Sequence, residues 1–223
     1  RLATSARPAA YDDASQSTYA GGFANAANGG TGFEPWQLSA GANSGFFIGD
    51  SNGNGCFNDG VGNCPPCGPG VNVFNAAFGM WANTSDTAHA VRRFHVGALV
   101  PGQSLSFDFD NGCLDGAGTK TGFALQSSTG EARFEFFFNG GDSVYRLHDA
   151  SGASVSTGVG FTQRGLHIVF TLTGPNSYSV TITRLMDGAF KNISGTLAGT
   201  NNTGIDRIDF SYFNSSKIGR AHV

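Results

Sequence analysis

Hydrophobic and polar residues alternate with a period of two along much of the chain. In one segment, Phe134, Phe136 and Phe138 fall on the same face of an extended chain. A strand with one buried face produces this alternation, because successive side chains point to opposite sides of a sheet. We therefore predict strands at 106–110, 133–138, 166–173, 178–183 and 207–212.

Turn-forming residues separate these runs, as at Asn111-Gly112 and Asp187-Gly188. About eleven to thirteen short strands follow at the spacing typical of sandwiches and barrels. This pattern predicts an all-β fold, a two-sheet antiparallel β-sandwich or jelly roll. The nearest candidate for a helix is the segment 83–91, which is short and polar, so we expect at most one helical turn there.

The length of 223 residues suits a single domain of this class. Residues 1–10 form a polar lead, and we expect the β-sandwich to span 11–216. The last residues, Ile218 to Val223, resemble a translated sequencing adapter. We therefore expect 217–223 to be a non-native tail and the sandwich to lack its last strand.

Charged residues make up only 13% of the chain, and 34 residues are glycine. Low charge with many turn formers is typical of a secreted, extracellular β protein. The net charge of −3 argues against a nucleic-acid partner. We interpret Arg92-Arg93, the only adjacent basic pair, as a solvated strand end. No window is apolar enough over about 18–20 residues to span a membrane.

Several segments occur in an order that resembles a group of bacterial secreted domains. Those domains are similar to the concanavalin A-like lectin/glucanase superfamily. The resemblance implies a concanavalin A-like sandwich, but that superfamily holds lectins, glycoside hydrolases and structural modules, so it does not choose a function. The matching residues are core and turn positions between Gly22 and Phe213, at 46–49, 78–83, 107–112, 133–138, 160–161 and 204–208.

Carboxylates are the first candidates for chemistry. A retaining glycosidase needs two of them about 5–5.5 Å apart, and the hydrolases of the superfamily commonly carry Glu-x-Asp-x-x-Glu. That motif is absent here. Asp108 and Asp110 share a strand face and precede Asn111. The favoured interpretation is the ordinary polar face of an edge strand, followed by binding of a sugar hydroxyl or an ion, and then by catalysis. A glycoside hydrolase or lyase using Asp108, Asp110 and Glu135 is the alternative.

Aromatic side chains are the second group of candidates, because the apolar face of a pyranose ring packs on an aromatic ring. Trp36, Trp81 and Tyr145 are candidate stacking platforms, although a place in the core or at its rim is favoured for the two tryptophans. The predicted ligand-binding set is therefore Asp108, Asp110, Asn111, Trp81 and Tyr145.

The segment 50–55 fits the start of a calcium loop, with oxygen ligands at Asp50, Asn52 and Asn54 and a glycine at the sixth position. The glutamate expected at the twelfth position is missing, and Asp59 is the nearest substitute. The other interpretation is a Gly- and Asn-rich loop without an ion. Ca2+ is the only cofactor that the sequence suggests.

Four cysteines, Cys56, Cys64, Cys67 and Cys113, lie in or near this loop. Cys64 and Cys67 have the spacing of a redox or zinc motif, but a zinc ribbon usually has two such pairs. In a secreted chain two disulfides are favoured. They would join the loop 49–70 to the turn that carries Cys113.

Together these features predict a non-catalytic extracellular module. Its partner would be a carbohydrate or a cell-surface polymer, and its role would be glycan binding or the building of a surface layer.

Overall fold

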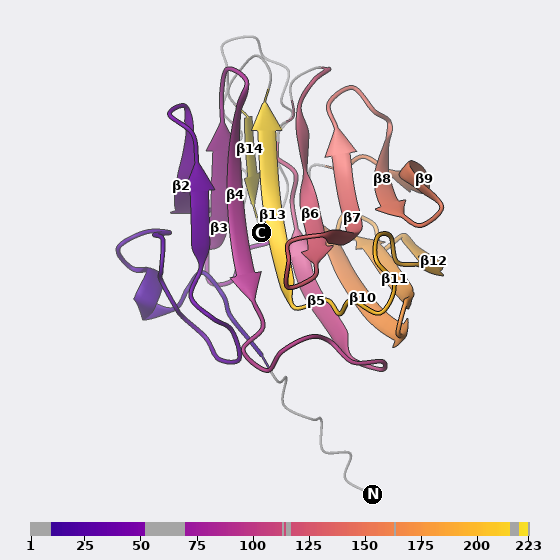
Figure 1. Ribbon diagram of the computed structural model, residues 1–223. Coiled ribbons are helices and arrows are strands. Elements are labelled where there is room, and N and C mark those ends of the chain that lie inside the picture. The colour runs from indigo at the N-terminus through magenta and orange to yellow at the C-terminus, as the bar shows by residue number, and fades with distance from the viewer. Residues whose placement is uncertain are drawn as a thin grey trace, which may run out of the picture.

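The computed structural model describes residues 10–51, 70–112, 114, 117–162, 164–214 and 219–222. This part of the chain is an antiparallel β-sandwich, as predicted (Figure 1). It contains one short 3-10 turn, Ser17–Tyr19, and no α-helix among the described residues. No described helix has the length and apolarity needed to cross a membrane. The strands are β1 (Gln37–Ala40), β2 (Ser44–Gly49), β3 (Ala77–Ala82), β4 (Asp86–Arg93), β5 (Ser104–Phe109), β6 (Lys120–Gln126), β7 (Ala132–Asn139), β8 (Val144–Asp149), β9 (Gly152–Gly160), β10 (Leu166–Gly174), β11 (Ser177–Arg184), β12 (Phe190–Thr196), β13 (Arg207–Asn214) and β14 (Gly219–His222).

Three sheets make up the sandwich. The large sheet has the order β1-β4-β13-β6-β7-β8-β9, so strands distant in sequence are neighbours in space. A four-stranded sheet has the order β12-β11-β10-β5, and a three-stranded sheet has the order β14-β3-β2. The short edge strand β14 lies within the segment predicted to be a non-native tail and pairs with β3.

The predicted alternation places the aromatic residues between the sheets. Phe134 of β7 contacts Phe170 of β10 and Tyr178 of β11, with ring centroids 5.2 and 4.9 Å apart. Phe107 of β5 likewise meets Phe123 of β6 at 4.8 Å. Burial of each such ring contributes about 1.5–3 kcal/mol to folding. The core therefore joins the four-stranded sheet to the large one.

The segment 83–91 differs from the prediction of at most one helical turn. Residues from Asp86 onward form β4, an internal strand paired with β1 and β13 rather than a helical turn. Its inward face carries Ala88 and Ala90. Alanine gives a weak apolar signal, which is why the alternation is hard to see in the sequence.

The Arg92-Arg93 pair is a second correction, because adjacent residues in a strand point to opposite faces. Arg92 points inward and is only 2% exposed, so it is not a solvated residue. Arg93 points outward at the end of β4.

Candidate ligand-binding site

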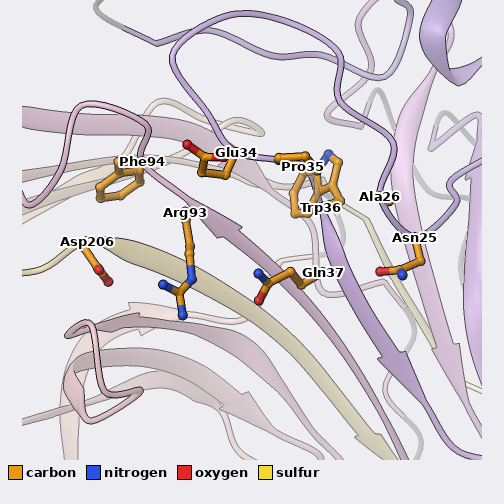
Figure 2. Close-up of a pocket in the computed structure, with 9 residues that line it drawn as sticks. All are labelled: Asn25, Ala26, Glu34, Pro35, Trp36, Gln37, Arg93, Phe94 and Asp206. Atoms are coloured by element: carbon orange, nitrogen blue, oxygen red, sulfur yellow. The ribbon is translucent and has the colours of Figure 1, made fainter.

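An open pocket of about 550 Å³ lies at one end of the large sheet, where β4 ends and β13 begins (Figure 2). Backbone hydrogen bonds hold its walls: Glu34 N donates to Arg93 O at 3.0 Å, and Phe94 N donates to Asp206 O at 2.8 Å. The pocket thus joins segments from three distant parts of the chain. Its lining consists of Asn25, Ala26, Glu34, Pro35, Trp36, Gln37, Arg93, Phe94 and Asp206.

The polar side chains of the pocket differ in whether they already form side-chain hydrogen bonds. Glu34 Oε1 lies 2.5 Å from His95 Nδ1, and Asp206 Oδ1 accepts from Arg207 Nε at 3.1 Å. Gln37 and Arg93 form no side-chain hydrogen bond with any described residue. Figure 2 draws Arg93 between Gln37 and Asp206. The pocket therefore offers an amide and a guanidinium to a ligand.

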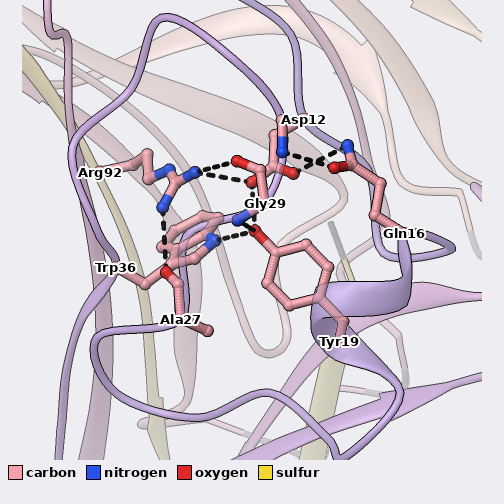
Figure 3. Close-up of polar contacts among 8 residues, drawn as sticks. Asp12, Gln16, Tyr19, Ala27, Gly29, Trp36 and Arg92 are labelled. Carbon is pink, nitrogen blue, oxygen red and sulfur yellow. Dashed lines mark hydrogen bonds and ion pairs between the residues drawn. The ribbon is translucent and has the colours of Figure 1, made fainter.

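The apolar part of the lining comes from Pro35, Trp36 and Phe94, of which Trp36 and Phe94 are largely buried. Trp36 also belongs to a buried polar network behind the pocket (Figure 3). Its indole Nε1 donates to the hydroxyl of Tyr19 at 3.1 Å, and the Arg92 guanidinium lies 4.9 Å from the centroid of its ring. Both contacts fix the orientation of this wall.

Arg92 is the centre of that network. One of its nitrogens donates to Asp12 Oδ2 at 2.9 Å and to Gly29 O at 2.8 Å, and another donates to Ala27 O at 3.2 Å. Tyr19 donates its hydroxyl proton to Asp12 at 2.5 Å. Burial and this bond raise the pKa of Tyr19 to about 12. The network ties the segment that precedes β1, which forms most of the pocket wall, to β4.

A second polar group lies on the outward face of the large sheet. His89 Nδ1 is 3.2 Å from both carboxylate oxygens of Asp209, and Gln126 Nε2 donates to Asp209 Oδ2 at 3.1 Å. The hydrogen bond to Asp209 raises the pKa of His89. Ser39 and Ser211 flank His89 in the neighbouring strands. These residues are not among the sites predicted from the sequence.

Three residues of the predicted ligand-binding set lie together but are buried. Asp110 and Asn111 follow the end of β5, and Tyr145 donates its hydroxyl proton to Asn111 Oδ1. Exposure is 3% for Asp110 and zero for Asn111 and Tyr145. Burial raises the pKa of Asp110 to about 7. The ring of Tyr145 stacks on Phe136 at 5.2 Å and presents no face to a ligand.

Asp108, by contrast, is half-buried, and it pairs with His167 across the β5–β10 ladder. Asp108 Oδ1 lies 2.6 Å from His167 Nδ1, and Ser106 Oγ lies 3.3 Å from His167 Nε2. These contacts have the order of a Ser-His-Asp triad. They lie on the open outer face of a sheet, however, and the described pocket is elsewhere.

The three carboxylates named for a hydrolase do not form one site. Asp108 points outward from the four-stranded sheet, whereas Glu135 points outward from the large sheet, where it lies 3.5 Å from Lys120 and 3.7 Å from His148. The aromatic core separates them, and Asp110 is buried. This arrangement contradicts a glycosidase centre built from these three residues, because such a pair spans at most about 9.5 Å.

Trp81 stands on the outer face of the three-stranded sheet and is half-buried. Its indole covers Gly45, where an added Cβ would come within 3.0 Å of Trp81 Nε1. Phe47 covers Gly79 in the same way. Neither ring is among the residues that line the pocket.

Most of the predicted calcium and cysteine positions lie outside the described residues. These are Asn52, Asn54 and Asp59 of the calcium loop and all four cysteines, Cys56, Cys64, Cys67 and Cys113. Asp50 is described, and its Oδ1 accepts from the side-chain amide of Asn72. Within the described ranges there is no group of three or more His, Cys, Asp or Glu that would hold a metal ion.

No protein-family model and no curated protein matches the chain. Among solved structures, a protein of unknown function from Shewanella oneidensis MR-1 gives a TM-score of 0.48 at 10% identity, over 84% of this chain and 77% of that one. The exoplasmic/lumenal domain of VIP36, bound to Ca2+ and Man3GlcNAc, gives 0.44 at 8% identity, over 84% and 80%.

A peptidase structure is also similar. Scytalido-glutamic peptidase with a peptide-based transition-state analogue gives a TM-score of 0.39 at 14% identity, over 61% of this chain and 72% of that one. At these scores and identities the likenesses concern general architecture and transfer no binding site or activity to this chain.

Proposed function

We propose that this domain is a non-catalytic carbohydrate-binding module that acts outside the cell. The observation that carries the proposal is the pocket, where Gln37 and Arg93 present N–H groups with no partner in the described structure. Binding sites for small ligands combine an apolar wall with a few convergent polar groups. Here Trp36 and Phe94 supply the wall, and the amide and carboxylate groups suit the hydroxyls of a sugar.

The test is a glycan array followed by calorimetric titration of the best ligand. The Gln37→Ala variant removes an exposed amide and should weaken binding several-fold. Asn192→Ala on β12, an exposed amide of the four-stranded sheet, is the matched control and should bind as the unmodified protein does. An array without any bound glycan, or equal losses in both variants, would reject this function.

The half-buried indole of Trp81 is a second place for contact with an extended glycan. Its contribution is tested by Trp81→Ala in the same titration. A loss of affinity for long oligomers but not for short ones would include Trp81 in the binding surface. Equal affinity for both lengths would restrict binding to the pocket.

The proposal includes a calcium site. Its oxygen ligands would be Asp50, Asn52, Asn54 and Asp59. Carboxylate and amide oxygens are suitable for this ion. Asp50 Oδ1 accepts from the side-chain amide of Asn72, and an ion at this carboxylate would compete with that bond. Calorimetric titration with Ca2+ decides the point: no heat and no rise in melting temperature would exclude the site.

A further inference from the structure

The charged side chains of the pocket are unevenly paired. Glu34 is held by His95 and Asp206 by Arg207. Arg93 is the remaining ionised group of the lining, and it has no ion pair with any described residue. The guanidinium of Arg93 thus has no counter-charge bound to it in the described structure.

A comparison with other arginines shows that Arg93 is unusual. The Nε atoms of Arg92, Arg93, Arg133 and Arg184 are all buried without an acceptor among the described residues. The guanidinium of Arg92 bonds Asp12, that of Arg133 bonds Asn176, and that of Arg184 pairs with Asp187. Of these four arginines, only Arg93 has a guanidinium without a partner at any nitrogen among the described residues.

An arginine in this state is suited to a ligand with a carboxylate. The guanidinium presents parallel N–H groups that match the two oxygens of a carboxylate, and such bidentate bonds are among the strongest in proteins. Only Nε of Arg93 is a buried atom without an acceptor, so its two terminal nitrogens are the donors that a ligand in the pocket would reach. Arg207 faces Arg93 across the β4–β13 ladder, and its guanidinium is already paired with Asp206.

We infer that the pocket selects an acidic saccharide, a uronic acid residue whose carboxylate is received by Arg93. This inference rests on the proposed function and specifies its ligand class. Gln37 and the carboxylates of Glu34 and Asp206 then bind hydroxyl groups of the same sugar ring. Asp206 is already paired with Arg207, and a protonated His95 would neutralise Glu34.

The experiment compares short oligomers of galacturonic, glucuronic and mannuronic acid with their carboxyl-reduced neutral counterparts, by calorimetric titration. The acidic oligomer of at least one pair should bind about tenfold or more tightly, as a charge-assisted bidentate contact implies. Arg93→Gln should abolish that difference, and Arg93→Lys should restore only part of it because the ammonium lacks the planar fork. Asn192→Ala should leave it unchanged.

The melting temperature distinguishes a loss of binding from a loss of folding. The glycan array distinguishes failure of this inference from failure of the proposed function. The melting temperature of Arg93→Gln should equal or exceed that of the unmodified protein, because the guanidinium has no partner to lose among the described residues. A marked decrease would assign Arg93 a structural role and overturn the inference. Neutral glycans bound on the array without any preference for uronic acids would overturn it while the proposed function stands. Tighter binding of sulfated than of carboxylated oligomers would also overturn it.

Discussion

The Asp110 cluster and the pocket contain similar kinds of residues but differ in their access to solvent. Asp110, Asn111 and Tyr145 are at most 3% exposed, and Tyr145 is hydrogen-bonded to Asn111 inside the sandwich. In the pocket, Gln37 is exposed and Arg93 has no partner within the described residues. A carboxylate, an amide and an aromatic ring can therefore be buried and hydrogen-bonded in one part of the fold, and open to a ligand in another.

A polar residue that is available to a ligand therefore differs from a structural one less in residue type than in whether its hydrogen bonds are already made. A buried polar group that already has its hydrogen bonds has nothing to offer a ligand and is costly to disturb. A group that lies in an open pocket and lacks a partner gains by binding. The buried network around Arg92 already has its hydrogen bonds, although it contacts the pocket wall, so we expect it to be structural.

The largest expected effect is in that network. Arg92→Met leaves the carboxylate of Asp12 buried without its cation, and breaking a buried pair in this way costs about 3–5 kcal/mol of unfolding free energy. Urea denaturation measures the loss. The double variant Arg92→Met with Asp12→Asn should recover a substantial part of it. A loss below about 1 kcal/mol in the single variant would contradict a structural role for this pair.

The next effect is a dependence of stability on pH through Asp110. Burial raises its pKa from 3.8 to about 7, so the folded protein binds this proton more tightly than the unfolded chain. The stabilisation is fully present below about pH 4 and is lost as the pH rises through about 7, by up to about 1.4 kcal/mol per unit. Denaturation between about pH 4 and pH 8 measures the slope.

The matched variant for this slope is Asp110→Asn, which retains the shape of the side chain but does not ionise. Its unfolding free energy should vary less with pH than that of the unmodified protein. An identical slope in both proteins would show that other groups, such as His89, cause the dependence.

The alternation of Phe, Leu and Ile residues was enough to predict the sandwich and its longest strands. β10 and β11 follow it closely, with Leu166, Ile168 and Phe170 facing inward on β10. β4 was missed because its inward residues are alanines. Its adjacent arginines held a usable signal, since one of two neighbours in a strand must point inward.

The pocket was not predictable in the same way. Gln37, Arg93 and Asp206 are far apart in sequence, and only the pairing of β4 with β1 and β13 brings their segments together. None of them belongs to a motif. The Asp110 cluster, in contrast, was selected because its residues are adjacent or aromatic, and sequence alone does not reveal that they are buried.

A smaller effect is expected at Asp108, which is two residues from Asp110 but lies on the outer face. Its pair with His167 joins two side chains that are each more than 40% exposed. Exposed pairs contribute about 0–1 kcal/mol, so Asp108→Asn should change stability far less than Arg92→Met does. Ester hydrolysis that is lost in this variant would instead give the Ser106-His167-Asp108 contacts a chemical role.

The smallest effect on stability is expected at Gln37. Its side chain is exposed and has no hydrogen bond with the described residues, so Gln37→Ala should change the unfolding free energy by less than about 0.5 kcal/mol. The effect of Gln37→Ala on glycan affinity should nevertheless exceed that of Asp108→Asn, because Gln37 lines the pocket and Asp108 does not. Denaturation and titration of the same two samples measure both quantities. If Gln37→Ala destabilised the fold and left affinity intact, the distinction between the pocket and the buried cluster would fail.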